Sequence, residues 1–281
     1  MMTQRTVKEV VVGRPSVDGA GVHLNRVLSR RTAKAFDPFL MLDSFDSRNP
    51  DDYVKGFPMH PHRGIETVTY LLSGNIEHQD SMGNKGVITD GACQWMTAGG
   101  GIIHQEMPRP APYLLVLQLW INLPAAQKMV APKYRGLEAD AVPMVDEGAV
   151  RVRVLCGSYQ GVEGAMQADY VPVVYLDVDI KPNGLWQWPT NPDDTVFVFT
   201  IKGDCSFENG QAPVAEKRAV LFNSGDTLPV QAGPQGVRLA ALSGKPLREP
   251  IYWEGPIVMN SEAEMEQAIR DLRNGTFVKH P

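Results

Sequence analysis

The segment Glu66-Thr-Val-Thr-Tyr-Leu-Leu-Ser-Gly74-Asn75 is a run of β-branched and aromatic residues that ends at a glycine turn. A second segment, Thr195-Val-Phe-Val-Phe-Thr-Ile-Lys-Gly203-Asp204, has the same pattern in the other half of the chain. Residues of this kind favour strands, and glycine beside a polar residue favours the turn between strands. The two segments therefore indicate that one strand-turn-strand unit occurs twice.

Strand patterns of the same kind continue through both halves. Besides 66–72 and 195–201, we expect strands at 7–12, 22–27, 114–121, 150–155 and 171–178. A strong helical pattern runs from Ser261 to Arg273, where Ser261 and Glu264 have capping-box spacing and Asn274-Gly275 ends the helix. The length of 281 residues suits two domains. We expect an all-β chain of two β-sandwich domains, residues 1–140 and 141–281, with the helix at the end of the second.

Composition excludes several classes of protein. Hydrophobic residues make up 43% of the chain, which is typical of a folded protein rather than a disordered one. The net charge of -5 and the absence of a basic patch argue against direct nucleic-acid binding. Three distant cysteines without a CxxC motif indicate neither a disulfide framework nor a thiolate zinc site. Since no segment has the pattern of a signal peptide or a membrane span, we expect a cytoplasmic protein with no membrane attachment.

Two pairs of side chains in the first half have the spacing of metal ligands on strands. His60-Pro61-His62 and His104-Gln105-Glu106 each place two coordinating side chains at positions i and i+2. Such residues point to the same face of a strand, so three nitrogens and one oxygen converge if the two strands face each other. A lone His-x-His is more often a hydrogen-bonded pair. The second pair, preceded by Gly99-Gly100-Gly101, favours a metal site.

This donor set suits one divalent first-row metal. Iron(II) is the leading candidate, with manganese, nickel, copper and zinc as alternatives, because imidazole and carboxylate ligands do not select sharply among them. Four protein ligands leave two positions of an octahedral metal for water, substrate or dioxygen, whereas a structural zinc site is closed. The glycine run lacks the Lys-Ser/Thr of a phosphate-binding loop, so no other cofactor is expected. His78 is expected to be a solvated or hydrogen-bonded histidine.

The repeat provides an internal control for the metal site. When Gly74 is aligned with Gly203, His60-Pro61-His62 falls on Pro189-Thr190-Asn191, and no histidine lies between Gln105 and Lys279. The second half therefore cannot form the same site, and we expect metal binding in the first half alone.

Four segments together resemble the pirin family of the cupin superfamily, in particular its bacterial pirin-like members. The resemblance covers nearly the whole chain and rests on Phe36-Asp-Pro-Phe-Leu-Met-Leu-Asp43, Phe57-Pro-Met-His60-Pro-His-Arg-Gly-Ile-Glu66-Thr-Val-Thr-Tyr-Leu71, Gln94-Trp-Met-Thr-Ala-Gly-Gly-Gly-Ile-Ile-His104-Gln-Glu-Met-Pro108 and Gly255-Pro-Ile-Val-Met-Asn260. It implies a bicupin, two jelly-roll barrels with a C-terminal helix. It further implies that the N-terminal cupin binds one metal through His60, His62, His104 and Glu106.

Glu66 departs from the pattern of many other cupins, in which the glutamate shortly after His-x-His is a metal ligand. The pirin resemblance assigns the ligand role to Glu106, so Glu66 is expected to orient an imidazole or to pair with a strand neighbour. For proton transfer, Glu106 is our first choice of catalytic base and Glu66 the second.

The resemblance leaves two functions open, because pirins are described both as quercetin dioxygenases and as regulators. We favour an enzyme, a metal-dependent quercetin (flavonol) 2,3-dioxygenase with a small aromatic substrate. The alternative is a non-catalytic iron or redox sensor that binds a partner protein.

Overall fold

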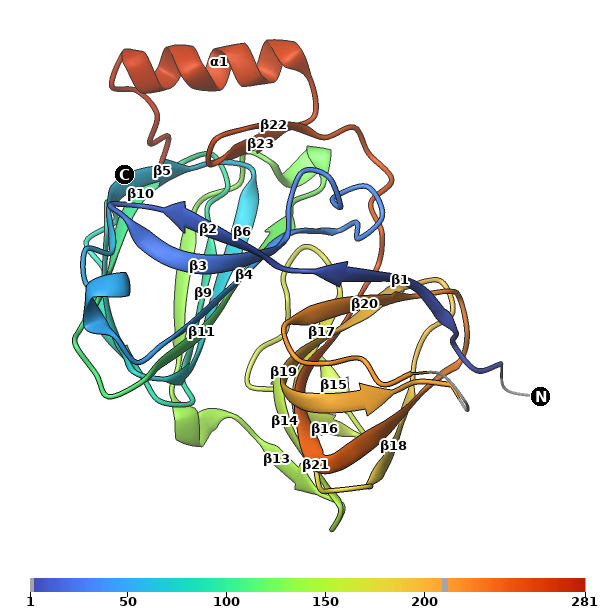
Figure 1. Cartoon of the computed structure of the whole chain (residues 1–281). Coiled ribbons are helices and arrows are strands. Elements are labelled where there is room, and N and C mark those ends of the chain that lie inside the picture. Colours follow the sequence, from blue (N-terminus) through green and yellow to red (C-terminus); the bar gives the residue numbers. More distant parts are fainter. Residues whose placement is uncertain (1–2, 209–211, 281) are drawn as a thin grey trace. The chain divides into compact units, whose positions relative to one another are not determined.

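The expected strands form as the sequence pattern indicates, and the fold is all-β with one α-helix, which confirms the bicupin prediction (Figure 1). The computed structural model describes residues 3–208 and 212–280. Short 3-10 helices occur at Pro50–Asp52, Ala125–Gln127 and Ala139–Ala141. Among the described residues, no helix has the length and apolar character needed to cross a membrane.

The chain forms two compact units, each built from segments that are distant in sequence. The first unit contains the chain up to Arg14, residues 34–38 and residues 141–246, and the second contains residues 15–33, 39–140 and the chain from Leu247 onward. One boundary falls at the expected 140/141 division. The contiguous domains 1–140 and 141–281 differ from these units because each end of the chain joins the other half: β1 pairs with β20, and the Val258 N–H donates to the Arg63 oxygen.

The second unit contains two main sheets and a C-terminal hairpin. The seven-stranded sheet has the order β12-β9-β6-β11-β4-β3-β2, the four-stranded sheet has the order β5-β10-β7-β8, and β22 pairs with β23. The strands are β2 (Arg14–Asp18), β3 (Val22–Leu28), β4 (Phe39–Ser47), β5 (Phe57–His62), β6 (Ile65–Ser73), β7 (Asn75–Asp80), β8 (Lys85–Thr89), β9 (Cys93–Thr97), β10 (Ile102–Pro108), β11 (Leu114–Asn122), β12 (Lys133–Leu137), β22 (Tyr252–Glu254) and β23 (Ile257–Met259). Inward-facing side chains of β3, β4, β6, β7 and β11 form an apolar cluster inside this unit.

The first unit is an eight-stranded sheet with a small hairpin. Its order is β1-β20-β19-β21-β17-β14-β13, with β18 paired to β21 and β15 to β16. The strands are β1 (Val7–Val12), β13 (Met144–Asp146), β14 (Val150–Cys156), β15 (Ser158–Tyr159), β16 (Val162–Glu163), β17 (Val173–Ile180), β18 (Leu185–Pro189), β19 (Thr195–Ser206), β20 (Arg218–Phe222) and β21 (Thr227–Gly244). Trp186 and Trp188 lie in its core. The turn expected at Gly203 does not occur: β19 continues from Thr195 to Ser206, and Gly203, with a φ of 80°, lies where the pairing of β19 with β21 shifts.

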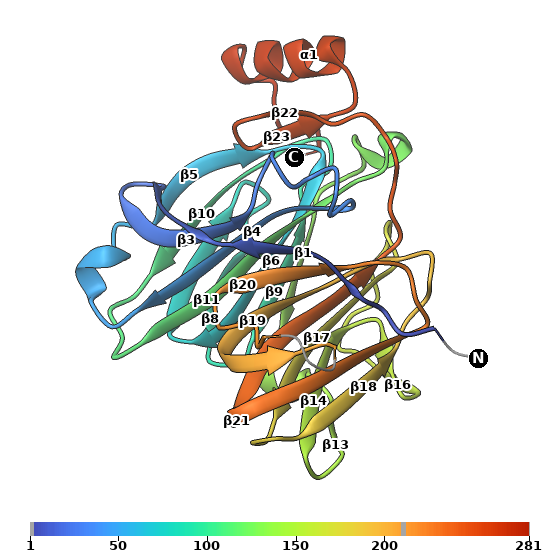
Figure 2. The same ribbon diagram turned by 45° about the vertical axis from the view of Figure 1, so that its right-hand side comes forward.

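Helix α1 (Glu262–Arg273) begins where the capping motif predicts. The Ser261 side chain accepts a hydrogen bond from the Glu264 backbone N–H, which satisfies one of the unpaired donors of the first turn. Met265 and Ala268 face inward and pack with Ile257 and Met259 of β23. Both views show α1 lying over β22 and β23 (Figures 1 and 2).

Gly64, between β5 and β6, provides a test of how closely the C-terminal hairpin β22–β23 packs against this turn. Its φ is +78°, and a Cβ added there would lie 2.0 Å from the Val258 carbonyl oxygen. Gly83 has a φ of +89° but no atom within 4 Å of such a Cβ.

We expect Gly83→Ala to lower the free energy of unfolding by about 1–2 kcal/mol, the usual cost of a left-handed conformation. Gly64→Ala should lower it by clearly more, because the hairpin must also move. Urea denaturation of both variants measures the difference, and equal losses would contradict the close seating.

Candidate metal centre

Pairing of β5 with β10 brings the two sequence motifs together. The strands are antiparallel, with His60 opposite His104 and His62 opposite Ile102. The centroid of the His60 imidazole ring lies 4.8 Å from that of His62 and 4.4 Å from that of His104. One nitrogen from each ring lies within 4.8 Å of the other two. The three histidines that the i, i+2 spacing singled out therefore converge on one point.

Hydrogen bonds to backbone carbonyls set the tautomers of two of these histidines. His60 Nδ1 lies 2.9 Å from the Pro58 oxygen, and His62 Nδ1 lies 3.2 Å from the Pro256 oxygen. A carbonyl oxygen only accepts hydrogen bonds, so each Nδ1 carries the proton and donates it. The lone pair of each ring is then on Nε2, the atom that faces the centre of the group.

The positions of the nitrogens fit a bound metal ion. The Nε2 atoms of His60 and His62 lie 3.1 Å apart. Two adjacent ligands at metal–nitrogen distances of about 2.1 Å and a right angle would be separated by about 3.0 Å. Among the described residues, neither ring nitrogen of His104 has a hydrogen-bond partner, although the side chain is completely buried. Unpaired buried nitrogens of this kind are expected when a metal is their partner.

Burial keeps these imidazoles neutral, which is the form that binds metals. Desolvation, aided by the neighbouring His60, lowers the pKa of His62 to about 3. Desolvation also lowers the pKa of His104 well below its ordinary value. The chain therefore presents three neutral nitrogen donors and fits a divalent metal such as the one expected from the sequence.

Glu106 follows His104 by two residues on β10 and lines the same cavity as His60 and His62. Burial raises the pKa of its carboxyl group to about 7, against the effect of Thr69. The Thr69 hydroxyl oxygen lies 2.8 Å from Glu106 Oε1 and 2.6 Å from Gln118 Oε1. A hydroxyl has one proton to donate, so a protonated Glu106 can supply the second of these two bonds. The group of converging donor atoms contains the three histidines without Glu106, so its role as fourth ligand stays a prediction.

Glu66 does not reach the cavity. Its carboxylate is fully buried, and Oε1 accepts a hydrogen bond of 2.6 Å from the Thr97 hydroxyl. On β6 it points to the face opposite Thr69, which lines the cavity, and Glu66 is absent from the lining of that cavity. Glu66 and His62 lie on different sheets, because β6 and β5 are separated by the turn at Gly64. We therefore do not retain Glu66 as a candidate base, while its role in orienting an imidazole stays a prediction.

His78 lies next to the centre and is hydrogen-bonded, one of the two states expected for it. It is buried, with Nε2 3.2 Å from Asp80 Oδ2, and its ring stacks on Tyr134 and lies 5.4 Å from the His104 ring. Its position was detectable in principle, because His78 and Asp80 also have i, i+2 spacing and pair with Glu106 and His104 across β7 and β10.

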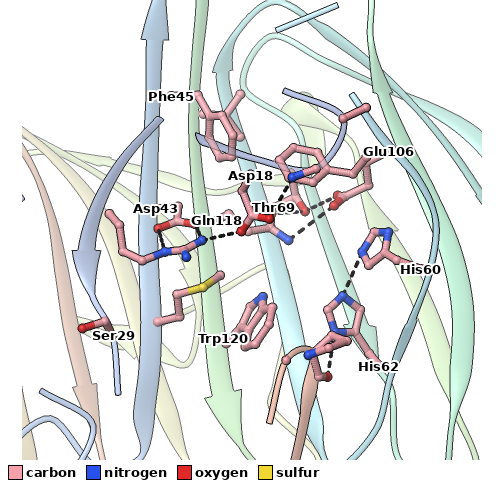
Figure 3. A pocket seen from close by; sticks show the side chains of 18 of the residues that line it. Asp18, Ser29, Asp43, Phe45, His60, His62, Thr69, Glu106, Gln118 and Trp120 are labelled. Carbon is pink, nitrogen blue, oxygen red and sulfur yellow. Dashed lines mark hydrogen bonds and ion pairs between the residues drawn. The ribbon is translucent and has the colours of Figure 1, made fainter. Parts of the chain in front are cut away.

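A cavity of about 770 Å³ opens beside the histidines within the second unit (Figure 3). Pockets of this size hold drug-sized ligands. Apolar side chains form much of its wall. Those on β4, β5, β7 and β11 are Met41, Phe45, Phe57, Ile76, Leu114, Val116 and Trp120, and the hairpin adds Trp253. A polar group that no sequence motif indicated lies opposite: Arg26 donates to both oxygens of Asp43, at 2.9 and 2.7 Å, and to Asp18 at 2.7 Å.

Comparison with known proteins agrees with this architecture. The family model Pirin matches residues 21–121, and the model described as Pirin C-terminal cupin domain matches residues 175–278. A Pseudomonas aeruginosa protein named "Putative quercetin 2,3-dioxygenase" is 43% identical over 99% of both chains. Human pirin is 36% identical over 98% of this chain and 94% of its own. A solved structure titled quercetin 2,3-dioxygenase, from Acinetobacter baumannii, is 31% identical and superposes with a TM-score of 0.90, covering 98% of both chains.

Metal analysis tests the three-histidine group directly. We expect purified protein to bind one divalent metal ion per chain and His104→Ala to lose most of it, because the variant removes a buried ligand. His23, which lies at the surface 3.6 Å from Asp52, serves as the control, and His23→Ala should keep the wild-type metal content. Elemental analysis after dialysis gives the stoichiometry. Equal metal content in the two variants would exclude His104 as a ligand.

The raised pKa of Glu106 predicts a pH-dependent stability of the metal-free protein. The unfolded carboxyl loses its proton near 4.5 and the folded one near 7, so the folded state loses stability as pH rises through this window. Glu106→Gln removes this loss. From pH 4.5 to 8, the variant should gain about 3 kcal/mol relative to wild type, since one pKa unit corresponds to about 1.4 kcal/mol. Urea denaturation of both metal-free proteins measures the change, and a pH-independent difference would contradict it.

Proposed function

Because the chain belongs to the pirin family of the cupin superfamily, we propose that it is a metal-dependent dioxygenase that cleaves a flavonol such as quercetin. The observation that carries the proposal is the position of the donors. His60, His62 and Glu106 lie on the wall of a cavity lined by aromatic side chains, so a planar aromatic substrate can reach a metal held there.

His60, His62 and His104 would hold the metal, with Glu106 as the proposed fourth ligand. A divalent metal, Fe(II) as first candidate and Mn, Ni, Cu or Zn as alternatives, supplies a Lewis acid that lowers the pKa of a bound hydroxyl group. The Nδ1–H bonds of His60 and His62 to backbone carbonyls keep their Nε2 lone pairs directed at this position.

The cavity walls suit a polyhydroxylated aromatic molecule. Phe45, Phe57 and Trp120 offer ring faces and edges to a planar substrate. Asp18, Arg26 and Gln118 line the same cavity and offer acceptors and donors for substrate hydroxyl groups. Apolar walls with a few polar groups are typical of sites that bind small molecules in one orientation.

Glu106 is the proposed base for the flavonol 3-hydroxyl. As a ligand through one oxygen, the Glu106 carboxylate would keep its second oxygen free to accept the proton of the substrate hydroxyl. Thr69 and Gln118 hold the carboxyl group in the cavity wall, since both lie within hydrogen-bonding distance of it. The residues of the chain thus orient the substrate and accept its proton, while dioxygen is the second substrate.

Turnover of quercetin tests the proposal. We expect metal-loaded protein to consume dioxygen and release carbon monoxide and a depside, the ester product of ring cleavage. Glu106→Gln should lower kcat by about 100-fold or more, the usual contribution of a general base. Asp52→Asn, at the surface beside His23, should keep the wild-type rate. Turnover no faster than that of the free metal, with Fe, Mn, Ni and Cu each tried, would overturn the dioxygenase proposal. Metal binding without turnover would favour the alternative, a metal or redox sensor for a partner protein.

A further inference from the structure

The metal ligand His62 depends on a carbonyl group from the far end of the chain. Its Nδ1–H donates to the Pro256 oxygen, in the turn of the β22–β23 hairpin. His60, by contrast, donates to Pro58 of its own strand. The tautomer of His60 is therefore fixed locally, whereas that of His62 requires residues 252–277, which we call the C-terminal segment.

The backbone after His62 is attached to the same segment. The Val258 N–H donates to the Arg63 oxygen at 3.1 Å. The buried ammonium group of Lys128 donates to the Gly64 oxygen at 2.8 Å and to the Val258 oxygen at 2.9 Å, joining the two backbones. These bonds place the hairpin turn beside His62.

Arg63 attaches the same backbone to α1. Its guanidinium donates to Asp271 Oδ2 at 2.8 Å and to the Phe277 oxygen at 2.7 Å, and lies 4.2 Å from the centre of the Phe277 ring. Arg63 is 1% exposed and Asp271 5% exposed. Removing one partner of a buried ion pair is strongly destabilising because it leaves the other charge without compensation. The arginine between His62 and Gly64 is therefore held by the helix.

We propose that the C-terminal segment is a positioning element of the metal centre: through the Arg63–Asp271 pair it keeps the Pro256 carbonyl on His62, and so fixes the tautomer and the place of the His62 Nε2 atom. The inference rests on the proposed metal site, though not on the proposed dioxygenase activity. Asp271 and Arg63 touch no substrate and act through His62. Loss of an outer hydrogen-bond partner of a metal-bound histidine typically weakens metal binding 10- to 100-fold.

Two substitutions in α1 separate this role from a general effect of the helix. Asp271→Asn removes the charge that holds Arg63 and keeps the shape of the side chain. Glu266→Gln is the matched control, since Glu266 pairs with Arg270 on the exposed face of the same helix. We expect Asp271→Asn to weaken Zn²⁺ binding 10- to 100-fold in competition with a chelator, and Glu266→Gln to leave it unchanged. Equal affinities in the two variants would overturn the inference, whereas a wild type that binds no Zn²⁺ would overturn the metal site itself.

Histidine NMR of the zinc-loaded protein gives a readout that helix stability alone does not move. In ¹⁵N-histidine-labelled wild type, His62 should show a protonated Nδ1 and a metal-bound Nε2, with slow exchange of the Nδ1 proton. Asp271→Asn should speed that exchange for His62 and leave His60 unchanged, because the acceptor for His60 is Pro58. Equal exchange at His62 in both proteins would contradict the proposal.

Arg63→Lys covers the case in which Asp271→Asn fails to fold. Lysine keeps the positive charge but cannot donate to Asp271 and Phe277 in the geometry of the planar guanidinium. We expect the same loss of Zn²⁺ affinity, with Arg270→Lys on α1 as the matched control. Unchanged affinity in Arg63→Lys would count against the proposal.

Discussion

The antiparallel pairing of β5 with β10 is the interaction on which the site depends. It sets His60 directly opposite His104, and strand alternation then brings His62 to the same side. A shift of the register by one residue would turn one strand's donors to the other face and separate the group. Because backbone hydrogen bonds on both sides of β10 fix this register, the donor geometry does not rely on side-chain packing alone.

The polar groups buried around this pairing are tolerated because most of them have defined partners. His78 bonds to Asp80, and Glu106 lies against Thr69 and Gln118. His104 is the exception among the candidate ligands, because neither of its ring nitrogens has a hydrogen-bond partner among the described residues. An unpaired buried polar group lowers the stability of a fold by about 1–3 kcal/mol. A metal that binds the lone pair of one His104 nitrogen would compensate for this loss of stability at that atom.

The carboxylates show how far local sequence rules extend. Glu106 follows His104 by two residues on one strand, and it lines the cavity together with His60 and His62. The same counting does not apply to Glu66, four residues after His62, because Gly64, with its φ of +78°, separates two strands of different sheets. Alternation holds within a strand and is lost across a turn.

Strands, the helix and its cap, the duplicated β pattern and the pairing of donors along each strand follow from neighbouring residues, and the sequence was sufficient to predict them. The resemblance of its longer motifs was likewise sufficient to identify the pirin family. The cavity wall formed by Arg26 and Asp43, the exchange of the chain ends between the two units, and the contacts of Pro256 and Asp271 with His62 and Arg63 could not be predicted in this way. These features join residues far apart in the chain, and their partners are chosen by packing in three dimensions, which no local periodicity encodes.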